Sequence, residues 1–119
     1  MVKSIAWVVV LLCAALIPLE SNAAPTALKC EIGPVTKIYG KTPWLVYSCD
    51  DGRSLVIISL PGSPAAPFVF TFIAKDKGYS LSGEGNGNQA AADAAHEDLK
   101  KLSDSDIAAL IAETKAISN

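Results

Sequence analysis

The sequence predicts an α+β domain, in which an antiparallel β-meander of five to six strands is followed by two C-terminal helices packed on one face of the sheet. Three observations lead to this prediction. Residues 28–83 contain short runs of β-branched and aromatic residues separated by Gly, Pro and Asp. Residues 88–117 are rich in alanine, and their leucines and isoleucines recur at helical spacing. The connections between the strand-like runs are too short for the crossovers that parallel pairing needs.

Residues 1–23 have the parts of a secretory signal peptide that is removed during export. A basic start is followed by an apolar run from Ile5 to Ile17. Ser21 and Ala23 then form a small-x-small site, which places cleavage before Ala24. As a helix the apolar run would span about 20 Å, whereas the hydrocarbon core of a membrane is about 30 Å thick. An uncleaved membrane anchor is therefore the weaker interpretation.

Residues 24–119 are the right length for one small domain, which we expect to work in the periplasm or outside the cell. The net charge is −2 and the lysines are scattered. A nucleic-acid-binding protein would show a clustered basic excess, so we expect no nucleic-acid partner. We also expect no stable membrane insertion once the signal peptide is gone.

Cys30 and Cys49 are the two cysteines that remain after the predicted cleavage. An even number of cysteines in a small exported domain predicts one disulfide. Closing a loop of about 20 residues would stabilise the fold by roughly 3 kcal/mol. Two buried free thiols are the alternative. A redox-active pair is less favoured, because the chain has no Cys-x-x-Cys motif.

The predicted strands are bounded by turn residues. Alternation of apolar and charged residues over 28–32 has the period of a half-buried strand, and Gly33-Pro34 ends it. Asp50-Asp51-Gly52 makes a tight hairpin turn, because Asp and Gly tolerate positive φ. Pro61-Gly62-Ser63-Pro64 breaks the ladder, and Lys75 to Gly78 makes a second turn. The strands predicted in this way are, in order, 28–32, 35–39, 44–49, 54–60, 68–74 and 79–83.

Two helices follow the strands. Asn88 is suited to cap the first helix, in which Ala92, Ala95, Leu99 and Leu102 recur at helical spacing. Ser103 is suited to cap the second, and the aspartates that follow it favour a helix N-terminus. The apolar stripe of the second helix consists of Ile107, Leu110, Ile111, Thr114 and Ile117.

The two central strands, 54–60 and 68–74, are apolar on both faces. Leu55 and Ile57 alternate with Val56 and Ile58, and three phenylalanines alternate with other apolar residues in the next strand. Two short helices cover one side only. The second face must be hidden by curling of the sheet towards a barrel, by the 61–67 loop, or by a partner. The candidate interaction surface consists of Trp44, Val56, Ile58, Leu60, Val69 and Ile73.

No set of residues predicts a catalytic, cofactor-binding or metal-binding site. His96 is the only histidine, and it stands among common surface acids without a His-Glu-x-x-His spacing. The Gly-x-Gly-x-Gly run at 83–87 does not have the spacing of a phosphate-binding loop, and we expect a flexible connector there. Turn formation accounts for Asp50 and Asp51. We therefore expect no cofactor and no enzymatic activity.

The sequence thus favours a non-enzymatic binding protein: an inhibitor, adaptor or immunity-type partner that acts on another exported protein or pairs with a second copy of itself. A small-molecule or lipid carrier with a cavity formed by a curled sheet is the alternative. A small enzyme is a third hypothesis, and it would have to use His96. No residue pattern identifies a family.

Overall fold

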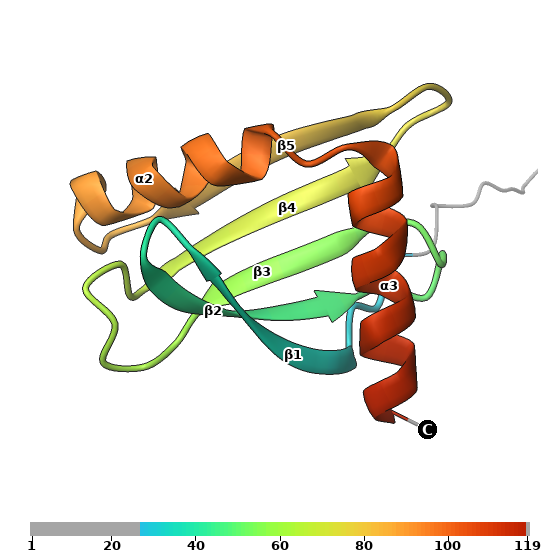
Figure 1. Cartoon of the computed structure of the whole chain (residues 1–119), viewed down its shortest axis with the longest axis horizontal. Coiled ribbons are helices and arrows are strands. Elements are labelled where there is room, and N and C mark those ends of the chain that lie inside the picture. The colour runs from blue at the N-terminus through green and yellow to red at the C-terminus, as the bar shows by residue number, and fades with distance from the viewer. Residues whose placement is uncertain (1–26, 119) are drawn as a thin grey trace, which may run out of the picture.

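The computed structural model describes residues 27–118 (Figure 1). The predicted signal peptide, residues 1–23, and its cleavage site before Ala24 lie outside the described residues. The described chain forms a five-stranded antiparallel sheet followed by two C-terminal helices, which confirms the predicted α+β class. The strands are β1 (Ile32–Tyr39), β2 (Thr42–Ser48), β3 (Leu55–Ser59), β4 (Phe68–Ala74) and β5 (Tyr79–Gly85), and the helices are α2 (Gln89–Lys100) and α3 (Asp104–Ser118).

Each strand pairs with its neighbours in sequence, so the spatial order of the sheet is β1-β2-β3-β4-β5. This is the meander that the short connections predict. β1 and β5 are the two edges, and they do not pair with each other. The described sheet is therefore open, and it has not curled into a barrel.

β1 corrects one prediction, because the strand expected over 28–32 does not form and β1 runs from Ile32 through Gly33-Pro34 to Tyr39. The ladder register shifts between Ile32 and Val35, so Gly33 and Pro34 form a bulge within β1. An edge strand tolerates a bulge and a proline, because one side of its backbone needs no strand partner. Residues 28–31 are not part of a strand.

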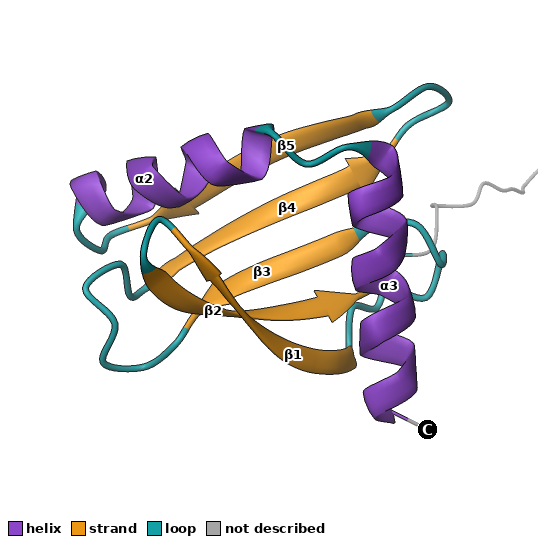
Figure 2. Ribbon diagram, in the orientation of Figure 1, coloured by secondary structure: helices purple, strands orange, loops and turns teal. Residues whose placement is uncertain are grey.

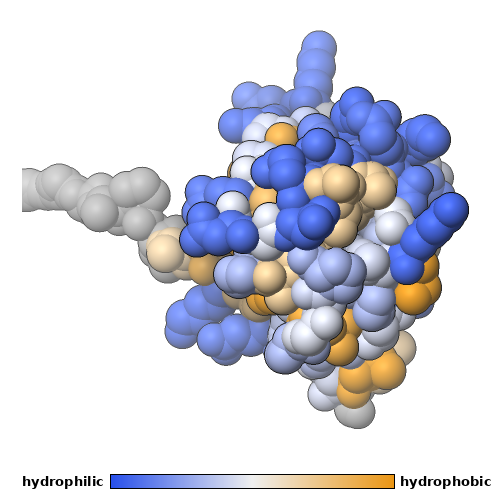
Figure 3. Space-filling view, turned by 90° about the vertical axis from the view of Figure 1, so that its left-hand side faces the viewer, coloured by the Kyte–Doolittle hydropathy of each residue, from blue (hydrophilic) through white to orange (hydrophobic). Residues whose placement is uncertain are grey.

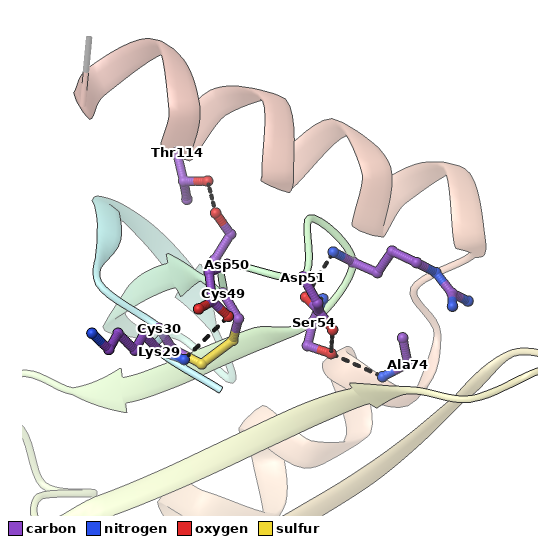
Figure 4. The surroundings of a disulfide bond; sticks show 10 residues. Lys29, Cys30, Cys49, Asp50, Asp51, Ser54, Ala74 and Thr114 are labelled. Atoms are coloured by element: carbon purple, nitrogen blue, oxygen red, sulfur yellow. Dashed lines mark hydrogen bonds between the residues drawn. A yellow bond between two sulfur atoms is a disulfide. The ribbon is translucent and has the colours of Figure 1, made fainter. Parts of the chain in front are cut away.

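The β2–β3 turn lies where the sequence places it, and the Cys30–Cys49 disulfide joins it to the chain before β1 (Figure 4). The two sulfur atoms are 2.06 Å apart, which confirms the predicted disulfide. The backbone N–H of Asp50 donates to the Lys29 carbonyl at 2.8 Å, and the Lys29 N–H donates to Asp50 Oδ1 at 3.2 Å. The segment before β1 is thus held beside the turn by covalent and hydrogen bonds.

Both helices begin at the predicted caps. Asn88 Oδ1 accepts a hydrogen bond from the Ala91 N–H at 2.9 Å. Ser103 Oγ accepts from the Asp106 N–H at 3.1 Å, and Asp106 Oδ2 accepts in return from the Ser103 N–H at 2.8 Å. The second pair is a capping box with aspartate in the reciprocal position. Neither described helix is long and apolar enough to cross a membrane.

The helices form a single layer on one face of the sheet (Figures 1 and 2). α2 runs along the β5 side of the sheet, and α3 crosses the strand ends on the right of the view. The core lies between this layer and the sheet. Its largest fully buried side chains include Trp44, Leu55, Ile57, Leu99 and Ile107.

The 61–67 loop packs at the end of the sheet. Ala65 is fully buried in the core between sheet and helices, and the Asn88 N–H donates to the Pro64 carbonyl at 3.0 Å. The N–H groups of Asn86 and Gly87 both donate to the Pro67 carbonyl. The loop is therefore tied to the β5–α2 connection, and it does not cover the second face of the sheet. The connection itself is hydrogen-bonded rather than the free linker that its glycines suggest.

Candidate functional site

The face of the sheet opposite the helices carries two rows of apolar residues that run across the central strands. In the first row Leu45 of β2 pairs with Ile58 of β3, which pairs with Val69 of β4. Residues that face each other in an antiparallel pair point to the same side of the sheet, so each row forms a continuous strip. We call this surface the outer face and define it by Leu45, Tyr47, Val56, Ile58, Val69, Thr71 and Ile73, together with the flanking positions of β1 and β5 named below.

The outer face is accessible along its length. Ile58, at its centre, is 37% exposed, and the six other central residues are partly exposed. On β1, Ile38 is 63% exposed and pairs with Pro43. No described helix or loop covers these side chains, whereas the opposite face is fully buried at Leu55 and Ile57.

Polar residues border the apolar centre. Ser80, Ser82 and Glu84 lie on β5 opposite Ile73, Thr71 and Val69, and Thr36 lies on β1 opposite Leu45. Among these paired positions of the outer face, Glu84 is the only charged side chain. An apolar centre with a polar border is the usual anatomy of a surface that binds another protein.

The outer face includes a shallow open groove at one corner. It has a volume of about 480 Å³ and is lined by Ile58, Val69, Pro67, Glu84 and neighbouring residues. Its lining is mainly apolar, and Glu84 is the charged residue among the residues that line it. The end of the molecule drawn in Figure 3, by contrast, is mostly hydrophilic, with the strongest apolar colour towards the lower right and smaller apolar patches elsewhere in that view.

Four of the six residues predicted as an interaction surface, Val56, Ile58, Val69 and Ile73, lie together on the outer face. Leu60 is partly exposed and follows β3 directly. The inclusion of Trp44 is wrong, because its side chain is 0% exposed and lies in the core. It pairs with Lys37 and Ser59, and this register turns its ring towards the helices.

Leu45 and Tyr47 were not among the predicted surface residues. Both belong to β2, whose register with β3 places them opposite Ile58 and Val56. The sequence signal was present, because they alternate with Trp44 and Val46, which are fully buried. The predicted surface took Trp44 from this strand, whereas Leu45 and Tyr47 lie on the opposite face from Trp44.

The residues with catalytic potential are not assembled into a reactive set. His96 lies in α2 and stacks on the Phe70 ring at 5.7 Å between ring centroids, and Asp93 accepts a hydrogen bond from Gln89. Cys30 and Cys49 are consumed by the disulfide. Within residues 27–118 no cluster of three or more His, Cys, Asp or Glu side chains is placed to hold a metal ion.

Tyr39 is the one buried phenol with a strongly shifted pKa. Its side chain lies between β1 and α3 in the core. Burial raises the pKa of Tyr39 to about 12, and the nearby carboxylates of Glu113, Asp106 and Asp98 act in the same direction. The phenol therefore stays protonated near neutral pH and does not act there as a base or nucleophile.

No protein-family model, characterised protein or solved structure matches the chain. A function is therefore inferred from the chain's own surfaces.

Proposed function

We propose that the chain is an exported, non-enzymatic protein that binds another exported protein through the outer face of its sheet. The observation that carries this proposal is the one-sided packing of the helices, which leaves a second apolar face uncovered in the described chain. Contiguous exposed apolar surface of this extent usually marks an interaction site.

The size of the outer face suits a protein partner. Five strands of about seven residues, spaced about 4.8 Å apart and rising about 3.4 Å per residue, cover about 600 Å². A standard protein–protein interface buries about 800 Å² per partner, so the outer face with its flanking loops approaches that area. The groove near Glu84 is open, which favours a protein surface over an enclosed small ligand.

The composition of the outer face also favours a protein partner. Its centre carries Tyr47 and branched aliphatic side chains, and the paired positions bear a single charge at Glu84. Interfaces deplete charge from their centres and leave polar groups at their rims. Recognition would therefore rest on apolar packing around Ile58, with serines and Glu84 setting the orientation.

Export is the second part of the proposal. The Cys30–Cys49 disulfide forms and persists in oxidising compartments, and the first 23 residues have the pattern of a cleaved secretory signal. We therefore place the protein in the periplasm or the extracellular medium. The carrier and enzyme hypotheses stay predictions from the sequence, because no observation on the described residues favours either over binding.

The test compares two equal substitutions at exposed isoleucines. Ile58→Lys places a charge at the centre of the outer face, and Ile117→Lys places the same charge at the exposed end of α3, where the isoleucine is 60% exposed. The tagged protein and both variants are used to capture partners from a fraction of exported proteins. The strongest captured protein is then purified and titrated against each variant.

We expect Ile117→Lys to bind as the unmodified protein does, and Ile58→Lys to weaken binding about tenfold or more, because it buries an unpaired charge. Circular dichroism and thermal unfolding confirm that both variants are folded. Equal binding by all three proteins would refute the assignment to the outer face. Light scattering on the purified protein identifies the case in which the partner is a second copy.

A further inference from the structure

The two edges of the sheet differ in how their outward backbone groups are satisfied. At the β1 edge, the Gly33 N–H donates to Ser118 Oγ at 2.7 Å, and the Gly40 N–H donates to Asp98 Oδ2 at 2.7 Å. Pro34 has no N–H, and α3 packs against the strand. The two ends of the β1 edge are therefore occupied, which hinders the addition of another strand along its full length.

The β5 edge has none of these protections among the described residues. The Lys75 N–H donates to the Gly78 carbonyl and the Asn86 N–H donates to the Pro67 carbonyl, each at 3.0 Å. Hydrogen-bonded pairs recur at every second residue of an antiparallel ladder, so the even-numbered residues of β5 bond to β4. The N–H and C=O groups of Leu81 and Gly83 therefore point outwards, and within residues 27–118 they have no backbone partner.

Two hollows lie beside this free edge on the helix side. One, of about 140 Å³, is formed by Phe68, Phe70, Gly83 and His96, with Asp93 at its rim. It exists because residue 83 is a glycine: a Cβ there would stand 2.6 Å from the Phe70 ring. The other, of about 360 Å³, is lined by Phe72, Tyr79, Leu81 and the start of α3.

The hollows are arranged as a strand would require. Gly83 lines one hollow and Leu81 lines the other, and these two residues are one side-chain repeat apart on the same face of β5, about 7 Å. A strand added to β5 would place alternate side chains in the two hollows while its backbone bonds to Leu81 and Gly83. Main-chain bonds supply affinity and the alternating pockets supply specificity in this mode of binding.

The charged side chains around the hollows favour a basic segment. Asp93 and Asp104 line them, one at each end. Lys100 also lines the larger hollow, but its ammonium group is 2.8 Å from the Glu97 carboxylate. A lysine or arginine that flanks the apolar positions of an added strand would therefore meet two carboxylates that form no ion pair within residues 27–118.

We propose that β5 accepts an extended segment of a partner polypeptide as a sixth strand, seated between β5 and α2. The segment has apolar side chains at alternate positions and a flanking basic residue. This binding mode is distinct from the outer face and does not depend on it.

The probe is a displayed library of random ten-residue peptides, selected against the intact, disulfide-bonded protein. Enriched peptides are synthesised and titrated against the unmodified protein, Leu81→Pro and Leu81→Ala. Both variants lose the leucine side chain, but only proline removes an outward N–H, and the ladder to β4 does not use that N–H. We expect Leu81→Ala to bind within about threefold of the unmodified protein and Leu81→Pro to bind about tenfold more weakly.

A second measurement uses the unmodified protein and stands even if Leu81→Pro does not fold. Bound peptide should slow amide hydrogen exchange at Leu81 and Gly83, and Ile58→Lys should bind the peptide normally. Failure to enrich any peptide, equal affinity of the two Leu81 variants, or protection confined to the outer face would each overturn the proposal. So would a dimer that Leu81→Pro dissociates, because a second copy would then occupy the edge.

Discussion

Asp51 holds the β2–β3 turn together with both oxygens of its carboxylate (Figure 4). Oδ1 accepts from the N–H groups of Arg53 at 2.9 Å and Ser54 at 2.8 Å, and Oδ2 accepts from Ser54 Oγ at 2.6 Å. Ser54 Oγ in turn accepts from the Ala74 N–H at 3.0 Å, which connects the turn to β4. Partial burial raises the pKa of Asp51, but these hydrogen bonds and the Arg53 charge outweigh it and lower the pKa below 3.8.

Asp51→Asn should therefore cost about 1 kcal/mol of unfolding free energy near neutral pH, because the amide cannot replace both accepting oxygens. A carboxyl whose pKa is lower in the folded state stabilises the fold above its ordinary pKa of 3.8, and this contribution is lost as the pH falls below that value. Denaturant unfolding of both proteins at several pH values should show the difference shrinking in acid. Asp76→Asn, in the exposed β4–β5 turn, is the control, and a difference for Asp51→Asn that persists in acid would contradict the prediction.

The burial of the Trp44 ring could not be predicted from the residues next to it in the sequence. The predicted interaction surface includes Trp44, but strand register decides which way a side chain points, and register is a long-range property. The buried indole N–H finds acceptors at the Tyr39 carbonyl, 3.1 Å away, and at Thr42 Oγ1, 3.0 Å away. The turn between β1 and β2 that presents these acceptors was predicted, but the inward direction of the ring was not.

At the scale of elements, the tip of the β1–β2 hairpin packs directly on the backbone of α2. Gly40 has φ +59°, and a Cβ at this position would stand 2.6 Å from the Ala94 carbonyl carbon. The Asp98 carboxylate, which belongs to the same helix, accepts a hydrogen bond from the Gly40 N–H. The first hairpin and the first helix thus meet where only glycine fits.

Gly40→Ala should lower the free energy of unfolding by about 3 kcal/mol, since it adds a collision to the strain of positive φ. Gly78→Ala is the matched control. Gly78 has φ +72° and open space around its Cβ position, so its substitution should cost only the strain, about 1 kcal/mol. Chemical denaturation of the three proteins measures both values. Similar losses for the two substitutions would show that the hairpin does not press on the helix.

Most elements could be predicted because local signals agree with the fold. Residues 68–74 form a strand with the predicted bounds, and both helices begin after their predicted caps. β1 could not be predicted as one strand, since Gly33-Pro34 is a breaker in a central strand and a tolerated bulge at an edge. The predicted meander makes residues 79–83 an edge strand, but the hollows beside this edge could not be predicted, because they depend on where the two helices pack.

At the scale of the whole molecule, one face of the sheet is covered by helices and the other is exposed, and one disulfide crosslinks the described chain. The Cys30–Cys49 disulfide fastens the segment before β1 to the end of β2, away from α2 and from the β5 edge (Figures 1 and 4). The apolar content of the outer face could be predicted from the alternation in β3 and β4. Its exposure could not, because it depends on where the helices and the 61–67 loop pack.

Replacing both cysteines with serine should lower the free energy of unfolding by about 3 kcal/mol, mainly because the unfolded chain regains the freedom of a loop of about 20 residues. Thermal or chemical unfolding measures the loss, and the reduced unmodified protein should behave like the double variant. Unchanged stability in either sample would contradict this prediction. It would mean that the segment before β1 is not part of the structure that unfolds cooperatively.

The protection of the β1 edge has a consequence for biosynthesis. β1 is the first strand of the described chain, whereas Asp98 and Ser118, whose side chains accept the Gly40 and Gly33 N–H groups, come after all five strands. Until the final helix docks, a newly made chain carries an exposed strand edge that can pair with other incomplete chains. Chains that end before α3 should therefore accumulate as insoluble material.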